Sequence, residues 1–310
     1  MINRKTKLEP RSKFHRKVSL TAIIPIGDVK GDLQTLKSWI NESKKFPLKL
    51  ILIHDISDER TALQLSEISN NFEKSKLMLI NGKFGSPGFA RNAGLEYVKS
   101  EWVAFWDCDD KPMLETIFNA IASSDNDDEV IIGGFQVRNA SNNFVNYKFS
   151  IKPTLNSISL NPAVWRMVFK SKLIEKLRFT DLKLAEDHLF IAEINLPERK
   201  LNYVSKSFYE YIYGGKNQLT SKSSNLPDLG LASSLLLRST KSQQNSQVIF
   251  FNLALIFRQQ FTLVKQGNFH LKFQALQFLA KCVISTRPHT FWIGIKALAF
   301  VLTKIKSSKL

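Results

Sequence analysis

Segments rich in apolar and β-branched residues alternate with segments of helical periodicity along the first third of the chain. The apolar runs lie at 18–25, 48–53, 77–80 and 102–106, with helical spacing at 32–40 and 62–72 between them. Short apolar runs without alternation are typical of strands covered on both faces. Strands that alternate with helices in this way predict a mostly parallel α/β sheet built from right-handed crossovers.

The segment 85–110, GSPGFARNAGLEYVKSEWVAFWDCDD, carries the clearest local signals. Ser86 followed by Pro87 predicts a helix start, because a hydroxyl can cap free N–H groups and proline suits the first turn. Residues at steps of four then predict one apolar face of that helix, whose small residues permit close packing: Phe89, Ala93 and Tyr97, with Ala90, Gly94 and Val98 one residue along. The apolar run that follows predicts a buried strand.

Three carboxylates, Asp107, Asp109 and Asp110, come directly after that strand. They cannot stay buried, so they should emerge at the carboxyl edge of the sheet, where open α/β sheets bind ligands. Because like charges raise one another's pKa, a positive charge is expected among them. Mg²⁺ or Mn²⁺ carrying a diphosphate would suit such a site. A solvated acidic turn is the alternative.

Two other polar loops are predicted at the same edge. Pro25 to Asp28 follow the first strand, and Asp55 to Ser57 follow the second. Because the carboxyl ends of parallel strands meet at one edge, the three loops should converge on a single cleft. Further along, a strand at 129–135 and a hairpin over 137–149 are expected, and alternating tyrosines at 209–213 predict another strand.

The order of these motifs resembles the family 2 glycosyltransferases, nucleotide-sugar-dependent enzymes with the GT-A fold. IIP ends the first strand, an aspartate ends the second, and ARNAG, FWDCDD and AEDHLF follow. ARN-x-G with the next strand and D-x-D-D is the most specific part. The resemblance implies a GT-A catalytic domain at 18–222, a Rossmann-like sheet flanked by helices. A basic leader at 1–17 would precede it, and a C-terminal helical extension at 223–310 would follow.

Residues that match the family's motifs take their expected roles from the resemblance. Nucleotide-sugar binding is expected at the matching positions Pro25, Asp55, Arg91, Asp107 and Asp109, and also at Asp28 and Ser57 in the same loops. Within this set, Asp107 is expected near the ribose, and Asp109 at a metal that bridges the diphosphate and that has Asp107 nearby. Gly27, Asp28 and Ile56 differ from the residues usual in the family, which affects the expected contacts with the base.

The segment 184–190, LAEDHLF, is expected to supply the general base. Inverting sugar transfer needs a carboxylate opposite the leaving diphosphate, which takes the proton from the attacking hydroxyl. Asp187 matches the family's catalytic aspartate and is favoured over Glu186. A plain helix N-terminus with acidic residues in its first turn is the structural alternative. His188 is expected at the surface.

Acceptor binding is expected near Trp165. The segment 161–174 resembles the acceptor-side helix of these enzymes, and Trp165 would lie either in the core or under a sugar ring. The segment 214–222 resembles a loop that closes over the diphosphate, with Lys216 or Lys222 as its positive charge.

Charge is unevenly distributed in this chain of 310 residues with a net charge of +17. Residues 200–310 contain fifteen Lys and Arg against two acidic residues, whereas 18–199 is nearly neutral. This disfavours a nucleic-acid enzyme with a positive active groove. The cysteines, Cys108 and Cys282, have no metal-ligand spacing and predict a reducing, cytoplasmic setting. No signal peptide or membrane-spanning segment is expected.

The basic C-terminal region predicts amphipathic helices. One apolar face contains Phe269, Phe273, Leu276, Ala280 and Val283. Such helices either pack on the catalytic domain or also lie on an anionic membrane, where each basic group contributes about 1 kcal/mol. We expect both, and hence a peripheral protein on the inner face of the plasma membrane.

The sequence therefore predicts an inverting, metal-dependent glycosyltransferase. By resemblance, the donor is a UDP-sugar and the acceptor a bacterial surface glycan or lipid-linked glycan of the lipopolysaccharide, capsule or exopolysaccharide type. A nucleotidyltransferase is one alternative, although the segment 25–31, PIGDVKG, is a poor phosphate loop. A non-catalytic nucleic-acid-binding protein that uses the basic termini is the other.

Overall fold

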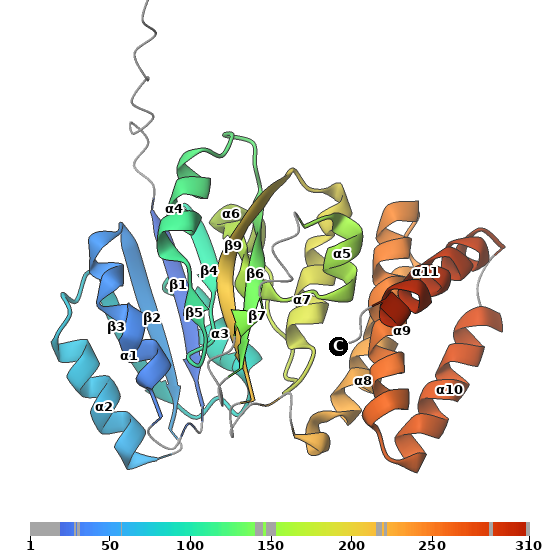
Figure 1. The fold of residues 1–310 in the computed structure, drawn as a ribbon, viewed down its shortest axis with the longest axis horizontal. Coiled ribbons are helices and arrows are strands. Elements are labelled where there is room, and N and C mark those ends of the chain that lie inside the picture. Colours follow the sequence, from blue (N-terminus) through green and yellow to red (C-terminus); the bar gives the residue numbers. More distant parts are fainter. Residues whose placement is uncertain are drawn as a thin grey trace, which may run out of the picture.

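The computed structural model describes residues 19–27, 29, 32–56, 58–139, 145–146, 153–214, 219, 222–284 and 288–307. In this part of the chain, a twisted sheet lies between layers of helices, and a bundle of C-terminal helices packs at one end (Figure 1). The predicted leader at 1–17 and Lys216 lie outside the described residues.

The sheet has nine strands in the described part of the chain. They are β1 (Leu20–Ile26), β2 (Leu48–Asp55), β3 (Leu77–Gly82), β4 (Trp102–Phe105), β5 (Lys111–Pro112), β6 (Val130–Asn139), β7 (Val145–Asn146), β8 (Met167–Lys170) and β9 (Leu201–Tyr213). Their order is β3-β2-β1-β4-β8-β6-β9-β5, and β7 pairs with β6 as one arm of the predicted hairpin.

The strands of the predicted α/β repeat, β1 to β4, run parallel, whereas four of the eight strand pairings in the described chain are antiparallel. β3, β2, β1 and β4 are consecutive parallel neighbours, and β6 is parallel to β9. β8 is antiparallel to both β4 and β6, so β6 runs in the same direction as β4. The carboxyl ends of β1, β2, β4, β6 and β9 consequently lie at one edge of the sheet, which we call the carboxyl edge.

Helices cover both faces of the sheet. They are α1 (Gln34–Ile40), α2 (Glu59–Asn70), α3 (Pro87–Leu95), α4 (Leu114–Ala122), α5 (Leu155–Leu160), α6 (Ser171–Ile174), α7 (Glu186–Ile194), α8 (Pro227–Lys241), α9 (Ser246–Gln266), α10 (Phe269–Ile284) and α11 (Pro288–Ser307). Short 3-10 turns lie at Glu42–Lys45, Val164–Arg166, Leu196–Glu198 and Ser223–Asn225.

Two hydrophobic cores follow from the alternation of side chains along the strands. In β1, Ile23 faces a core shared with α3, α7 and α9, whereas Ala22 and Ile24 face a core shared with α1, α2 and α4. All three side chains are fully buried. This explains why the strand residues form continuous apolar runs in the sequence.

The segment 161–174 is not the helix that the sequence suggested. It contains a 3-10 turn, strand β8 and the single helical turn α6. β8 inserts between β4 and β6, and Val168 and Phe169 point into opposite cores. Periodicity cannot separate a short apolar strand from a buried helix, and here the backbone hydrogen bonds with two neighbouring strands decide.

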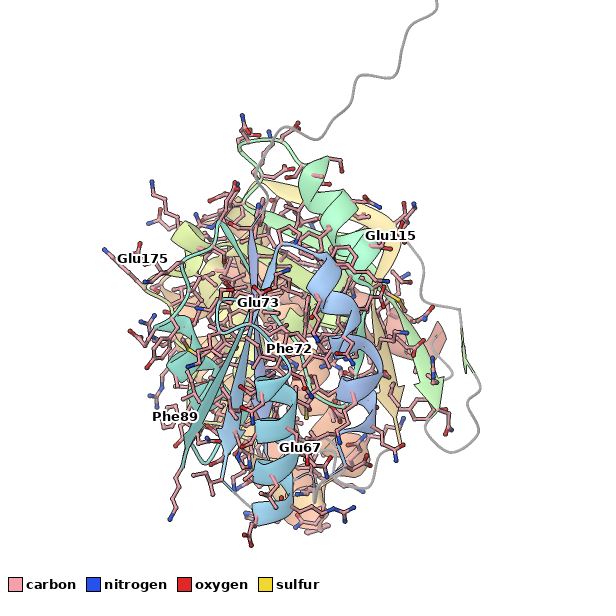
Figure 2. All side chains as sticks on the ribbon, turned by 90° about the vertical axis from the view of Figure 1, so that its left-hand side faces the viewer. Glu67, Phe72, Glu73, Phe89, Glu115 and Glu175 are labelled. Carbon is pink, nitrogen blue, oxygen red and sulfur yellow. The ribbon has the colours of Figure 1, made fainter. Side chains whose placement is uncertain are left out.

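The predicted apolar face of α3 is right for the small residues Ala90 and Gly94, which are buried, and wrong for two large ones. Phe89 is 43% exposed and Tyr97 44% exposed, and Figure 2 shows Phe89 at the outer surface. The small residues permit the predicted close packing, because α3 lies directly against β1. A Cβ added at Gly94 would be 2.6 Å from Ile23 Cγ2, so only glycine allows this approach.

The C-terminal helices form a bundle around α9. α8, α10 and α11 all pack against α9, which also contacts α5 and α7 of the part that covers the sheet. Among the described helices, α9 is long and apolar enough to cross a membrane, but 67% of its apolar window is buried inside the protein. Its apolar composition therefore reflects its position at the centre of the bundle.

Candidate active site

Helix α3 is held at the carboxyl edge by close contacts along its first two turns. Ser86 caps the helix by accepting a hydrogen bond from the Phe89 backbone amide at 3.4 Å. A Cβ at Gly88 would lie 2.5 Å from the Thr180 carbonyl oxygen. Asn92 exchanges two hydrogen bonds of 2.8 Å with the Phe179 backbone. The ARNAG motif thus fixes α3 against the segment that leads into α7.

The loop after β4, residues 107–110, contains three aspartates, and we call it the acidic loop. Arg91 on α3 joins this loop to the first turn of α7. Its Nη2 lies 2.8 Å from Asp107 Oδ1, and its Nη1 lies 2.6 Å from Glu186 Oε1. The Arg91 side chain is only 4% exposed, so both contacts are charge-assisted hydrogen bonds in a low-dielectric surrounding. Burial lowers the pKa of Arg91, but the charges of Asp107 and Glu186 outweigh burial and raise it.

Two hydrogen bonds connect the acidic loop to β9, and its three carboxylates differ in burial. Tyr209 Oη accepts a hydrogen bond from the Asp107 backbone amide at 2.8 Å, and the Ile212 amide donates to Asp110 Oδ1 at 2.7 Å. Burial and the charges of Asp109 and Asp107 raise the pKa of Asp110 well above its ordinary value. The buried Asp110 therefore anchors the loop, whereas Asp107 is half-buried and Asp109 is exposed.

The chemistry of this loop fits a divalent cation. Asp107 and Asp109 present carboxylate oxygens, the ligand type that Mg²⁺ and Mn²⁺ prefer, at the edge where the strands end. Asp107 Oδ1 accepts a hydrogen bond from Arg91, and Asp109 is exposed. The metal ligation predicted for these two residues stays a prediction.

Glu186 and Asp187 both lie in the first turn of α7 but differ in their surroundings. Glu186 is ion-paired with Arg91 and its side chain is 10% exposed, whereas the Asp187 side chain is 21% exposed. Asp187 Oδ1 accepts a hydrogen bond from the His188 amide at 2.9 Å. Burial and the charge of Glu186 raise the pKa of Asp187 to about 8, against the opposing effect of Arg91. A carboxylate with a pKa near neutrality is suited to take up a proton.

Aromatic rings pack beneath these carboxylates. Phe179 and Phe190 are stacked with ring centroids 4.0 Å apart, and Phe105 meets both edge to face. The Arg91 guanidinium lies 5.3 Å from the centroid of Phe179. This apolar layer keeps water away from one side of the charged cluster, which strengthens each electrostatic interaction within it.

The C-terminal bundle contributes directly to the surroundings of Asp187. Gln259 on α9 donates from Nε2 to His188 Nδ1 at 2.9 Å and accepts from Ser233 Oγ at 2.6 Å. The expectation of a surface His188 is wrong, because α8 and α9 cover it. Burial and the charge of Arg258 lower the pKa of His188 well below its ordinary value. A neutral imidazole therefore lies beside Asp187, with 3.7 Å between His188 Nε2 and Asp187 Oδ1.

The residues expected to hold the nucleoside lie at the ends of β1 and β2. Pro25 and Ile53 are paired neighbours in the two strands. Asp55 accepts hydrogen bonds from the backbone amides of Phe84 at 2.8 Å and Gly85 at 3.0 Å, so it fixes the loop that leads into α3. Asp28 and Ser57 lie outside the described residues.

Trp165 is half-buried in an aromatic cluster. Its ring stacks on Tyr209 with centroids 4.6 Å apart and on Tyr211 at 5.9 Å, and it meets Phe135 edge to face. Tyr209 is the residue whose hydroxyl holds the Asp107 amide. Trp165 is thus connected to the acidic loop through one side chain.

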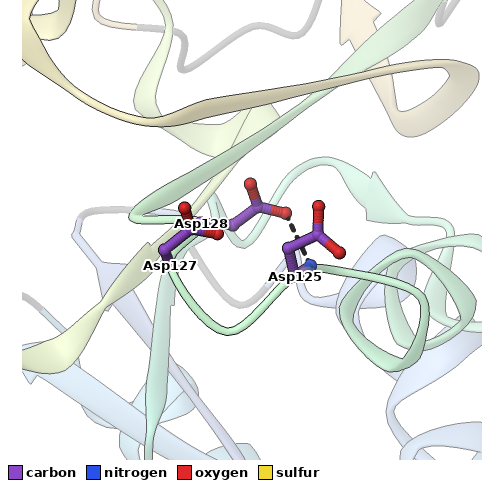
Figure 3. A group of neighbouring side chains, drawn as sticks. All are labelled: Asp125, Asp127 and Asp128. Carbon is purple, nitrogen blue, oxygen red and sulfur yellow. Dashed lines mark hydrogen bonds between the residues drawn. The ribbon is translucent and has the colours of Figure 1, made fainter.

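A second acidic cluster lies away from this site. Asp125, Asp127 and Asp128 offer oxygens within 4.8 Å of one another (Figure 3), but they precede β6 and so lie at the amino edge of the sheet. Asp128 accepts from the Asp125 amide at 2.9 Å, and Asp127 pairs with Lys200 at 2.9 Å. These contacts give the cluster a role in the turn before β6.

Comparisons with known proteins agree with this arrangement. The profile of the family described as Glycosyl transferase family 2 matches residues 33–188. The chain is 30% identical over 195 residues to the poly(ribitol-phosphate) β-N-acetylglucosaminyltransferase TarP of Staphylococcus aureus, which is 57% of each chain. It is 24% identical over 216 residues to glycosyltransferase GlyA of Streptococcus pneumoniae, or 62% of this chain and 30% of GlyA. The chain therefore spans less than two thirds of both relatives.

Solved structures share the fold. Residues 1–349 of S. aureus TarS in complex with UDP-GlcNAc match with a TM-score of 0.66 and 17% identity, covering 94% of this chain and 92% of that one. The mannosyltransferase PcManGT from Pyrobaculum calidifontis, in complex with GDP-Man and Mn²⁺, matches with a TM-score of 0.53 and 12% identity over 96% and 89%. The expected GT-A fold with C-terminal helices is confirmed.

The pKa of Asp187 predicts how the stability of the ligand-free protein depends on pH. Because the pKa is raised in the folded state to about 8, the Asp187 contribution to stability is full below the unfolded pKa and is lost as pH rises toward 8. Asp187→Asn keeps the acceptor oxygen without the charge. We expect its advantage in Tm over the wild type to grow between pH 5 and pH 8, roughly 2–4 °C for each kcal/mol. A constant difference across that range would contradict the assignment.

The link between α9 and α7 gives a second prediction. Gln259→Leu removes the partner of both His188 and Ser233, so it should lower the free energy of unfolding by about 1–3 kcal/mol. The matched control is Gln260→Leu, since Gln260 Nε2 is buried without a hydrogen-bond partner among the described residues. That change should be neutral or stabilising. Equal losses for both variants in denaturant titrations would argue against the link.

Proposed function

Since the chain belongs to glycosyl transferase family 2, we propose that it transfers a sugar from a UDP-sugar to a hydroxyl group of a bacterial cell-wall glycan, with inversion at the anomeric carbon. The main observation behind this proposal is the double contact of Arg91. It joins Asp107, proposed to lie at the donor, to Glu186, the neighbour of the proposed base Asp187. Family membership sets aside the nucleotidyltransferase and the nucleic-acid-binding protein as alternatives.

Asp187 is the proposed general base. Its side chain is more exposed than that of Glu186, and it lacks the direct Arg91 contact that Glu186 makes. The raised pKa, about 8, makes the ionised Asp187 carboxylate a stronger base toward the attacking hydroxyl than an ordinary aspartate. Glu186 and Arg91 would then act as positioning residues, which fix the start of α7 relative to the acidic loop.

Asp107 and Asp109 are proposed to hold the diphosphate end of the donor. Mg²⁺ or Mn²⁺, when bound through Asp109 with Asp107 nearby, would neutralise charge on the leaving UDP. The Mn²⁺ named with PcManGT supports testing this ion first. Asp110 stays outside the metal site in this scheme, because its carboxylate already accepts the Ile212 amide.

UDP-GlcNAc is the first donor to test, because TarS was solved with it and TarP is named as an N-acetylglucosaminyltransferase. The name of TarP also suggests a phosphate-bearing polyol polymer as the acceptor. A net charge of +17 would favour association with such a polyanion. Lipopolysaccharide and capsule intermediates are the next acceptors to test.

The test compares three single substitutions at fixed donor, acceptor and Mn²⁺. We expect Asp109→Asn and Asp187→Asn each to lower turnover by about a thousandfold or more, because each removes a group that acts on the reacting bonds. Asp127→Asn is the matched control at the opposite edge of the sheet and should keep wild-type turnover.

The kinetics can separate the two roles. Asp109→Asn should weaken the dependence of turnover on Mn²⁺ concentration, whereas Asp187→Asn should leave that dependence in place at a much lower rate. Wild-type turnover in either variant, together with an unchanged fold by circular dichroism, would show that the residue lacks its proposed role.

A further inference from the structure

We propose that α10 and α11 form a docking surface for an anionic lipid bilayer. This surface lies outside the catalytic site, and the proposal does not depend on which sugar is transferred. Figure 1 shows both helices at the end of the molecule opposite β3, where they pack on α9. A protein docked through this end would keep the carboxyl edge of the sheet available to substrates.

α10 is apolar on two opposite sides. One side packs inward through Leu271, Ala275, Phe278 and Leu279. The other side, at steps of four and three residues, faces outward with Phe269 86% exposed, Phe273 53% exposed and Leu276 55% exposed. An ordinary surface helix has one apolar stripe, which faces the core. The outward stripe on α10 therefore needs another explanation.

α11 repeats this arrangement. Ala297 and Val301 are buried against the bundle, and Leu298 and Phe300 pack beside them. On the opposite side, Trp292 is 64% exposed, and Ile295 and Leu302 are each 40% exposed. Tryptophan favours the interface between lipid and water, because its ring is apolar and its N–H is polar. Two neighbouring helices thus present outward apolar stripes that the rest of the described chain does not cover.

Charge points to an anionic partner. No Asp or Glu follows Asp228 in the sequence, whereas eleven Lys and Arg residues do. Lys272 on α10 and Lys296 on α11 are exposed on the same helices as the apolar stripes. Amphipathic helices that combine aromatic and aliphatic stripes with lysine, and contain no acidic residues, bind anionic membrane surfaces.

A bilayer explains these features better than two other partners do. A soluble polyanion would use the lysines but would leave the exposed phenylalanines and tryptophan in water. A second copy of the chain would bury the apolar stripes but would bring two strongly basic surfaces together, and like charges in contact disfavour association. An anionic bilayer satisfies the apolar stripes and the positive charge together.

The test uses the full chain and sedimentation with vesicles of phosphatidylcholine, alone or mixed with phosphatidylglycerol. We expect the wild type to sediment with the anionic vesicles, less so at high salt, because screening weakens the lysine contribution. Phe273→Ser combined with Trp292→Ser should lower the apparent affinity about tenfold or more. Leu63→Ser is the matched control, since Leu63 is 61% exposed but lies on α2, which covers the sheet far from α10 and α11. This variant should bind the vesicles as the wild type does.

Intrinsic fluorescence gives an independent readout. Trp39, Trp102 and Trp106 are buried, and Trp165 is half-buried in the aromatic cluster beside β9. Quenching by brominated lipid should therefore report mainly on Trp292, which is 64% exposed. Trp292→Phe should remove most of this quenching but keep the sedimentation.

Three outcomes would overturn the proposal. The first is that the wild type stays in the supernatant with anionic vesicles. The second is that the Phe273→Ser, Trp292→Ser variant sediments as the wild type does. The third is that, without vesicles, the wild type is a dimer and this variant is a monomer, which would make the surface a contact between copies. Unchanged binding of poly(ribitol phosphate) by the double variant would separate lipid docking from acceptor binding.

Discussion

The two ion pairs of Arg91 are the interaction on which the rest of the site depends. A buried guanidinium without partners would carry a large desolvation cost, and the carboxylates around it would repel one another. Each group is therefore stable at its position only because the others are present. Since Arg91 lies on α3, Asp107 after β4 and Glu186 at the start of α7, this cluster fixes three elements relative to one another. The same contacts place Asp187 beside the acidic loop.

Support for this cluster comes from the elements around it. Glycines on α3 allow backbone contact with β1 and with the segment before α7, and the aromatic layer of Phe105, Phe179 and Phe190 lies below. On the far side, α9 reaches His188 through Gln259. The C-terminal bundle is consequently part of the electrostatic surroundings of the proposed base, and it also presents an apolar, basic surface at the end of the molecule. The contact with His188 and the proposed docking to lipid thus involve different helices of one bundle, α9 in the first case and α10 with α11 in the second.

Several features could be predicted because they depend on local sequence. The abrupt change from WVAFW to DCDD places carboxylates at a strand end, and Ser86 with Pro87 defines the start of α3. Other features depend on partners far away in the chain. The strand β8 exists because two neighbouring strands supply hydrogen bonds, which a short apolar run does not reveal. His188 is buried because α8 and α9 cover it, and no spacing in the sequence pairs it with Gln259. Similarly, Asp55 and Asp110 resemble ligand-binding carboxylates, yet backbone amides engage both.

The central claim is that Arg91 couples the acidic loop to α7, the helix of the proposed base, during the proposed transfer. A double-mutant cycle of Arg91→Met and Glu186→Gln on kcat/KM measures this coupling directly. If the two residues act through their contact, each single change leaves a buried charge without its partner. The double variant should then be no worse than the poorer single variant, with a coupling energy of about 2 kcal/mol or more. Additive losses from the two substitutions would contradict the account.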